Sequence, residues 1–276
     1  MKLIHLTDPH LTKPGECIYG LNPQERFNAA IDDINRNHAD ADVCVITGDL
    51  AHTVEDRAYD VLHECLERLQ PPSYFIMGNH DNREKLKQRF PSVGVDKNGF
   101  IQSRITTEAG NLFLLDTVQP GTHEGVFCET RREWLREQLS QTEDVDAFLF
   151  THHPPFKIGI ASMDEIGMNE RDALAMGELL DEFDNVRHLF FGHLHRPLNG
   201  TWRGIGFSSI RATNHQVWLD FKECDHIPGS YEPPAYAIAL IERDQVVIHT
   251  HDFLDDSRKF SLGSWRYDDW VKENAK

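Results

Sequence analysis

The sequence has few cysteines, and their arrangement suits neither a zinc site nor a disulfide framework. The five cysteines are scattered and include no C-x-x-C pair: Cys17, Cys44, Cys65, Cys128 and Cys224. An odd, dispersed set is typical of a protein kept in a reducing compartment. We therefore expect a cytoplasmic protein without a cysteine-ligated metal.

Long apolar segments are also missing. No run approaches the roughly 20 residues that a membrane-spanning helix needs. The opening residues 1–8 contain no apolar stretch followed by small residues, so no signal peptide is expected. We find no internal repeat and no low-complexity tract. These absences predict a globular protein that does not act in a membrane.

Basic residues are outnumbered: 28 Lys and Arg stand against 45 Asp and Glu, which gives a formal net charge of −17. Such a charge disfavours binding to duplex nucleic acid or to an anionic membrane surface. An acidic protein can still bind a small phosphate compound if metal ions supply local positive charge. With 276 residues, the chain is long enough for a substantial core.

The first 80 residues predict strands that alternate with helices. Apolar runs indicate strands at 2–7, 42–47 and 73–77, and helical spacing indicates helices at 23–38 and 56–69. This β-α-β-α-β order is typical of a largely parallel sheet in an α/β protein.

The pattern continues to about residue 200 and then changes. We expect a helix ending near residue 90, a hairpin at 100–116, a helix at 130–140, a strand at 147–150, a helix from 170 to 183 and a strand at 187–191. Beyond residue 201, only short strands are predicted, at 202–210, 216–221, 235–241 and 245–251, with a loop at 224–234.

Histidine is abundant, with 16 copies, and the strongest apolar strands all end in histidine, carboxylate or amide side chains. These side chains are Asp8, His10, Asp49, Asn79, His80, His152, His193 and His195. Each alone could belong to an ordinary polar turn or be a buried core histidine. Because parallel strands end at one edge of a sheet, we expect the set to meet in one site.

The stretch Gly78-Asn79-His80-Asp81 stands out among these strand ends. Gly78 and Asn79 tolerate positive φ, so we expect a sharp turn there. Asn79 offers an oxygen ligand, His80 an acid or base, and Asp81 a carboxylate that could orient His80.

The ligand types indicate the kind of metal. Imidazole, carboxylate and amide donors without thiolate suit Mn, Fe, Co or Zn better than Ca²⁺ or Mg²⁺. The strand-end set without His80 offers seven such ligands, which exceeds what one ion with an open position can use. We therefore expect two ions that share a bridging carboxylate, as in sites for phosphoryl displacement.

At this point the sequence resembles a known superfamily. The motifs that match in order and spacing are Asp8-Pro9-His10, Gly48-Asp49, Gly78-Asn79-His80-Asp81, His152-His153 and Gly192-His193-Leu194-His195. They resemble the signature of the calcineurin-like metallophosphoesterases. The Tyr19-Gly20 loop and the stretch 213–217 look like the class III cyclic-nucleotide and glycerophosphodiester phosphodiesterases.

The resemblance implies a four-layer α-β-β-α sandwich with a strand-rich C-terminal extension. Residues 1–215 would form the catalytic core. Residues 216–276 would complete the second sheet and form a cap or an oligomer contact.

The resemblance also implies roles for the site residues. The first metal would be held by Asp8, His10, Asp49 and His195. The second would be held by Asp49, Asn79, His152 and His193, with Asp49 bridging. Because many relatives have Gly-His where this chain has His152-His153, a swap of the ligand role to His153 stays open.

Three further residues would act on the substrate. His80 would stabilise charge on the phosphate or give a proton to the leaving group, with Asp81 behind it. His215 resembles a second histidine on the substrate side. Tyr19 could border the pocket, and His52 could support the site. Arg83 and Arg196 are interpreted as surface or helix-end charges.

The predicted activity is hydrolysis of small phosphodiesters such as cyclic nucleotides or glycerophosphodiesters. A phosphomonoesterase and a non-catalytic scaffold of the same fold are the alternatives. Specificity is expected in the loops 12–22, 117–128 and 156–170. The aromatic tail around Trp265, Tyr267 and Trp270 is expected to pack on the body or on a partner subunit, and the resemblance favours a homo-oligomer.

Overall fold

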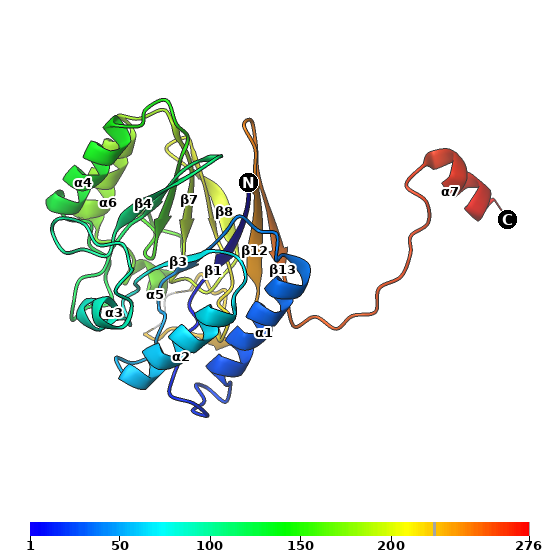
Figure 1. The fold of residues 1–276 in the computed structure, drawn as a ribbon, viewed down its shortest axis with the longest axis horizontal. Coiled ribbons are helices and arrows are strands. Elements are labelled where there is room, and N and C mark those ends of the chain that lie inside the picture. Colours follow the sequence, from blue (N-terminus) through cyan, green and yellow to red (C-terminus); the bar gives the residue numbers. More distant parts are fainter. Residues whose placement is uncertain (223–224, 276) are drawn as a thin grey trace.

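A computed structural model describes residues 1–222 and 225–275 and forms two β-sheets that pack face to face between layers of helices (Figure 1). The first sheet has the order β13-β12-β1-β2-β3. Its strands are β1 (Lys2–Leu6), β2 (Val43–Thr47), β3 (Ser73–Ile76), β12 (Tyr236–Ile241) and β13 (Val246–His251). The predicted four-layer α-β-β-α arrangement is confirmed.

The first sheet forms because β1, β2 and β3 are apolar and pair in parallel, with Leu3 opposite Val43. Three helices cover its outer face (Figure 1): α1 (Pro23–Asn37), α2 (Asp56–Arg68) and α3 (Arg83–Arg89). Helix α1 begins as its sequence predicts, because the Asn22 side chain accepts a hydrogen bond from the Glu25 amide.

The second sheet has the order β4-β5-β6-β7-β9-β8. Its strands are β4 (Ser103–Thr107), β5 (Gly110–Leu114), β6 (Ala147–Thr151), β7 (Val186–Phe191), β8 (Leu198–Trp202) and β9 (Ile205–Ser209). Helices α4 (Glu129–Ser140) and α6 (Glu170–Leu180) cover its outer face (Figure 1), and the short helix α5 (Ala161–Asp164) lies in the connection before α6.

The strand predicted over 202–210 forms as the shorter β9, but the strand before it, β8, was not predicted. Two strands, β8 and β9, form an antiparallel hairpin there, with Trp202 opposite Ile205. The turn residues Arg203 and Gly204 both have positive φ, 51° and 83°, which is the geometry of a tight two-residue hairpin.

Apolar side chains from both sheets fill the space between them. Phe148, Phe150 and Phe190 are fully buried there, and the rings of Phe150 and Phe190 stack with centroids 4.8 Å apart. This layer fixes the two sheets against each other, so the loops at their ends are held in one arrangement.

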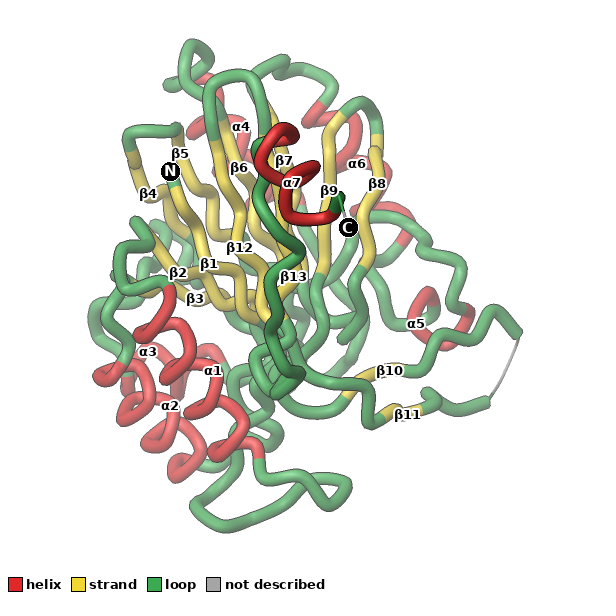
Figure 2. The backbone as a smooth tube through the Cα atoms, turned by 90° about the vertical axis from the view of Figure 1, so that its right-hand side faces the viewer, coloured by secondary structure: helices red, strands yellow, loops and turns green. Residues whose placement is uncertain are grey.

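The C-terminal strands differ from expectation. Strand β12 pairs antiparallel with β1, with Ile238 opposite Ile4, so β12 and β13 extend the first sheet rather than the second. The predicted strand 216–221 is reduced to β10 (Gln216–Val217), which pairs with β11 (Gly229–Ser230). Figure 2 shows this pair lying apart from both sheets. Cys224, the first residue of the predicted loop 224–234, lies outside the described residues.

The last part of the chain forms an arm, residues 254–275, that ends in α7 (Tyr267–Asn274) and extends away from the body (Figure 1). Trp265 is 89% exposed and Phe260 82%. Packing of the tail on the body is therefore a wrong prediction, whereas packing on a partner stays a prediction. No helix within residues 1–222 and 225–275 is long and apolar enough to cross a bilayer.

His5 is a titratable group buried between the sheets. Its Nε2 lies 2.8 Å from the Thr47 hydroxyl, and its ring packs edge-on against Phe150 and Phe190. Burial, with a smaller effect from the nearby His188, lowers the pKa of His5 to about 3. The folded protein therefore holds His5 neutral.

We expect His5 to reduce stability in acid. The unfolded imidazole binds a proton near pH 6.5, whereas the folded one does so only near pH 3. The free energy of unfolding is therefore unaffected by this titration above about pH 6.5, and it decreases as the pH falls from about 6.5 toward about 3. Replacing His5 by Gln should remove a loss of up to about 1.4 kcal/mol per pH unit. Urea unfolding near neutral and near acid pH measures this, with the exposed His249→Gln as control. Equal acid losses in His5→Gln and the unchanged protein would contradict it.

Candidate metal centre and pocket

All seven predicted ligands lie just beyond strand ends at one end of the two-sheet sandwich. The first sheet supplies Asp8 and His10 after β1, Asp49 after β2 and Asn79 after β3. The second sheet supplies the other three: His152 after β6, and His193 and His195 after β7. The site is thus built from both sheets rather than from one sheet edge.

One group comprises Asp8, His10, Asp49 and His195, whose ligand atoms all lie within 4.8 Å of one another. The Nε2 atoms of His10 and His195 are 3.1 Å apart. His195 Nε2 lies 3.4 Å from Asp8 Oδ1, and His10 Nε2 lies 3.5 Å from Asp49 Oδ2. All four residues are buried.

The hydrogen bond on the far side of His195 decides what this group can do. Its Nδ1 donates to the backbone carbonyl of His215, 2.8 Å away. The neutral ring then carries its lone pair on Nε2, which faces Asp8 and His10. A lone pair and two carboxylates that converge in a buried space are the donor set of a cation.

The second group is built around His152. Its Nδ1 donates to the carbonyl of Thr47 (2.7 Å), so Nε2 faces Asn79 Oδ1 at 3.0 Å and Asp49 Oδ1 at 3.4 Å. The buried Nε2 of His193 has no hydrogen-bond partner among the described residues. These atoms also form a donor set that a cation would satisfy.

Electrostatics agree with this conclusion. Burial alone would lower the pKa of His152, but the carboxylates of Asp49 and Asp8 raise it to about 9. The pKa of Asp49 falls well below its usual value despite its burial, because histidines surround it. The site therefore requires positive charge, which a metal ion supplies with the ring neutral.

The geometry distinguishes His152 from His153. Both ring nitrogens of His153 already have partners, with Nδ1 2.8 Å from the Thr117 hydroxyl and Nε2 3.1 Å from the His123 carbonyl. His152 keeps Nε2 directed at Asp49 and Asn79. His153 supports the loops around the site, although it lies within 4.8 Å of His152 and His193.

The backbone is strained at most of the ligands. Positive φ values, in the region that non-glycine residues rarely adopt, occur at Asp8 (50°), His10 (46°), Asp49 (47°), His193 (67°) and His195 (48°). The predicted sharp turn at Gly78 forms, with the Asp81 amide donating to the Gly78 carbonyl at 3.0 Å, but neither Gly78 nor Asn79 has positive φ. The unusual backbone lies one strand earlier, at Gly48 (92°) and Asp49.

Gly78 is needed for a different reason, which is close approach. A Cβ on Gly78 would lie 2.2 Å from Asp49 Oδ1 and 2.3 Å from the Asp49 amide nitrogen. Any larger residue would therefore displace the carboxylate that the two groups share.

His80 and Asp81 are not paired as predicted. The Asp81 carboxylate instead accepts hydrogen bonds from the amides of Gly78, Leu50 and Ala51. Burial and the nearby Asp49 raise the pKa of Asp81 to about 7. Its observed role is to fix the Gly78 turn against the loop after β2.

The ring of His80 is held by another residue. Its Nδ1 donates to the carbonyl of His52 (2.8 Å), and its Nε2 lies 4.0 Å from Asp49 Oδ2. The rings of His80 and His52 stack with centroids 5.4 Å apart. His80 thus points its Nε2 into the site, and His52 supports it.

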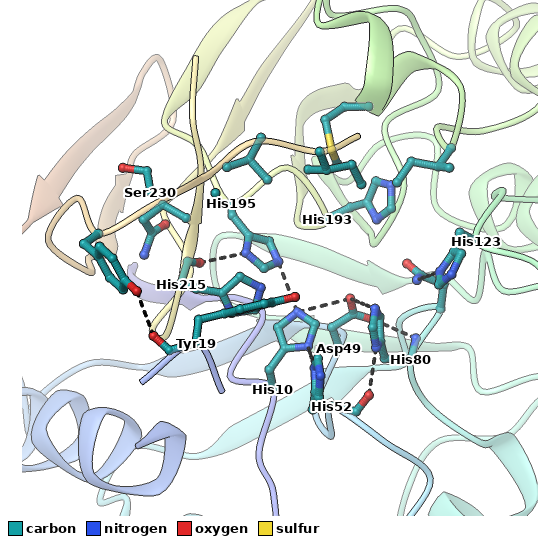
Figure 3. Close-up of a pocket in the computed structure, with 18 residues that line it drawn as sticks. His10, Tyr19, Asp49, His52, His80, His123, His193, His195, His215 and Ser230 are labelled. Carbon is teal, nitrogen blue, oxygen red and sulfur yellow. Dashed lines mark hydrogen bonds and ion pairs between the residues drawn. The ribbon is translucent and has the colours of Figure 1, made fainter. Parts of the chain in front are cut away.

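A pocket of about 440 Å³ opens over these groups (Figure 3). The ring of His215 lies 4.9 Å from those of His10 and Tyr19. His123 also lines the pocket, and sequence reasoning missed it. Its Nδ1 accepts from Asn79 Nδ2 (2.8 Å), which turns the Asn79 oxygen toward His152. The only sequence signal was its place in the loop 117–128.

The two arginines near the motifs are not surface charges. Arg83 makes a two-point ion pair with the fully buried Asp116. Arg196 bonds to the Val217 carbonyl and to Glu232. The surface interpretation is corrected for both, whereas Arg83, the first residue of α3, does lie at a helix end as expected. Each guanidinium holds a loop beside the pocket.

We expect Gly78→Ala to impair metal binding. The added methyl group displaces Asp49, so affinity for Mn²⁺ or Zn²⁺ should fall about tenfold or more. Metal analysis at limiting metal measures this, and circular dichroism checks the fold. Gly167→Ala is the control, since its Cβ would meet neighbours only at 3.6 Å. Unchanged metal affinity in Gly78→Ala would contradict the close approach of Asp49.

Comparisons with known proteins agree with this geometry. Residues 1–197 match the model of the calcineurin-like phosphoesterase family. The chain is 44% identical over 265 residues to a probable cyclic nucleotide phosphodiesterase of Rhodopseudomonas palustris, covering 95% of this chain and 96% of that one. It is 30% identical over 257 residues to a probable glycerophosphodiester phosphodiesterase of Arcobacter nitrofigilis, covering 91% and 92%.

A similar fold is seen in the crystal structure of a dimetal phosphatase from Danio rerio. The TM-score is 0.68 at 16% identity, with 92% of this chain and 96% of that chain covered. The residues matched by the family model include all seven candidate ligands, from Asp8 to His195. This chain belongs to the calcineurin-like phosphoesterase family.

Proposed function

We propose that this protein is a metal-dependent phosphodiesterase that hydrolyses small phosphodiesters such as cyclic nucleotides or glycerophosphodiesters. The observation that carries the proposal is the direction of two imidazoles. His152 and His195 each donate Nδ1 to a carbonyl and turn Nε2 toward buried carboxylates. The relatives that cover nearly the whole chain bear phosphodiesterase names, which supports the same reaction.

Two metal ions would fit the two groups of donors. One would be held by Asp8, His10, Asp49 and His195. The other would be held by Asp49, Asn79, His152 and His193, with Asp49 shared between them. In support, the two oxygens of Asp49 face different groups, Oδ2 toward His10 and Oδ1 toward His152. The donor types suit Fe, Mn, Zn or Co.

When bound, such ions would lower the pKa of a water molecule and offset charge on the phosphate oxygens. The chain supplies the remaining steps. As the water oxygen bonds to phosphorus, the P–O bond to the leaving alcohol breaks. His80, protonated on Nε2, would give its proton to the departing oxygen. Its hydrogen bond to the His52 carbonyl keeps Nε2 directed at the site.

The charge of the pocket favours a diester over a monoester. Among the described residues that line it, none is Lys or Arg. A diester carries one negative charge and a monoester up to two, so two cations suffice for the diester without basic side chains. A phosphomonoesterase is the second candidate function, since the protein of similar fold is a dimetal phosphatase. The next experiment distinguishes the two activities.

The defining experiment compares hydrolysis of bis(p-nitrophenyl) phosphate and p-nitrophenyl phosphate by the metal-loaded protein. We expect the diester to have the higher kcat/KM. A higher value for the monoester would overturn the preference. No hydrolysis of either, with fewer than two ions bound per chain, would identify a non-catalytic scaffold.

Two substitutions separate metal binding from proton transfer. Asp49→Ala should abolish diester hydrolysis and metal binding together, because it removes the shared ligand. His80→Asn should lower kcat by about a hundredfold or more while bound metal stays unchanged. The exposed Glu242→Gln serves as control. Normal turnover by Asp49→Ala, or loss of metal in His80→Asn, would contradict these roles.

Two other expectations remain proposals. Residues 1–215 would serve as the catalytic core and 216–276 as an extension that caps the pocket, which the place of Val217 and Ser230 in its lining supports. A reducing compartment, the cytoplasm, would suit the four described cysteines, all of which are free.

The arm, residues 254–275, would contact a second copy of this chain. It carries the large apolar side chains Phe260, Leu262, Trp265 and Tyr267, each at least 76% exposed. Within α7, all of which is described, no residue is buried. Apolar surface of this extent is typical of an interaction site.

We expect light scattering to find a dimer or larger assembly. A variant that ends at Asp255 should form an assembly with fewer subunits. Trp265→Ser should weaken the assembly, whereas Lys259→Ala, an exposed arm residue, should not. If the shortened chain keeps the same number of subunits, the arm does not hold the assembly together.

A further inference from the structure

The pocket has an apolar wall that the hydrolytic step does not use. Its residues come from three segments and are Tyr19, Met163, Ile166, Val217, Ile227 and Tyr231. Figure 3 shows Tyr19 beside His215 and His10, while Ser230 lies apart from them on the β11 segment. Tyr231 is 74% exposed and Ile227 is 47% exposed although both line the pocket.

This wall is held in place by specific bonds. Strands β10 and β11 pair through Gln216 with Ser230 and Val217 with Gly229. The hydroxyl of Tyr231 donates to the Tyr19 carbonyl, 3.0 Å away and 212 residues distant in the chain. Figure 3 draws this bond as a dashed line that ends beside Tyr19.

Arg196 holds the same segment from the other side. It donates to the Val217 carbonyl at 2.7 Å and to Glu232 at 2.8 Å. Arg196 directly follows the candidate ligand His195, so the rim is fixed relative to the metal centre. An aromatic ring held in this way is ready to receive a ligand rather than to pack in a core.

The polar groups near the wall have little capacity left for a polyol. The Gln216 side chain already bonds to the Ala212 amide and carbonyl and to the Asn214 carbonyl. The Ser230 hydroxyl accepts from the Glu232 amide. A glycerol group placed against the apolar wall would gain few hydrogen-bond partners from it, whereas a flat ring would gain apolar contact and stacking.

We propose that Tyr231, with Ile227 and Val217, forms a subsite for a flat aromatic substituent of the substrate, such as a nucleobase. The subsite selects nucleotide diesters over glycerol diesters. This inference rests on the proposed function, because it concerns the alcohol side of the diester that the metal centre would cleave.

The test compares kcat/KM for 3′,5′-cyclic AMP and for glycerophosphoethanolamine. The unchanged enzyme should prefer the cyclic nucleotide. Tyr231→Ala should lower kcat/KM for the nucleotide about tenfold to a hundredfold, mainly through KM, because base stacking contributes about 1–3 kcal/mol. The value for the glycerol diester should change less than about threefold, since it makes no stack.

Two further variants isolate the ring from its hydroxyl. Tyr231→Phe keeps the ring and loses the bond to Tyr19, so it should retain most of the preference. Phe221→Ala removes an aromatic side chain that is 69% exposed but does not line the pocket, and it should change nothing. Equal losses on both substrates in Tyr231→Ala, or a preference of the unchanged enzyme for the glycerol diester, would overturn the subsite.

Binding of adenosine 5′-monophosphate separates this inference from the proposed reaction. If the metal-loaded protein hydrolyses neither diester, the proposed function fails. Calorimetry then still decides the subsite: about tenfold weaker binding to Tyr231→Ala than to the unchanged protein supports it. Equal binding, or no binding, overturns it.

Discussion

The structure depends on the burial of two carboxylates that no Lys or Arg of the described residues neutralises. Asp8 and Asp49 are almost fully buried, and within residues 1–222 and 225–275 their ion-pair partners are all histidines. Burying an ionised carboxylate costs several kcal/mol unless positive charge compensates it. His152 and His195 each donate the Nδ1 proton to a backbone carbonyl, so their Nε2 lone pairs face the carboxylates. This set of donors fits cations, which would compensate the negative charge of Asp8 and Asp49.

The two sheets and their loops maintain this arrangement against strain. Five candidate ligands have positive φ, and each such residue costs on the order of 1 kcal/mol or more. The sheets are locked where they meet: a Cβ on Gly192 would lie 2.3 Å from the Thr7 hydroxyl, and His152 of the second sheet bonds to Thr47 of the first. Strain of this kind persists only where surrounding packing determines the backbone. Such packing is present between the sheets, where Phe150 and Phe190 of the second sheet share one buried cluster with Leu3 of the first.

The sequence predicted the features that follow a local pattern, and it did not predict contacts between residues that are distant in the chain. Apolar strands followed by Asp, Asn or His are visible as a pattern, so the α/β class, the candidate ligands and the superfamily resemblance could be stated in advance. The partner of Asp81 could not, because its three amide donors lie in a turn and in a loop 30 residues away. His123 was missed and Arg196 was misinterpreted for the same reason: each acts through a residue distant in sequence, Asn79 in one case and Glu232 in the other.

The central claim is that side chains from two sheets hold a pair of metal ions around Asp49. Anomalous diffraction from crystals of the protein loaded with Mn²⁺ tests it most directly. The account predicts two peaks, one between Asp8 and His195 and one between His152 and His193, with the Asp49 carboxylate between them. A single peak, or peaks away from Asp49, would contradict it.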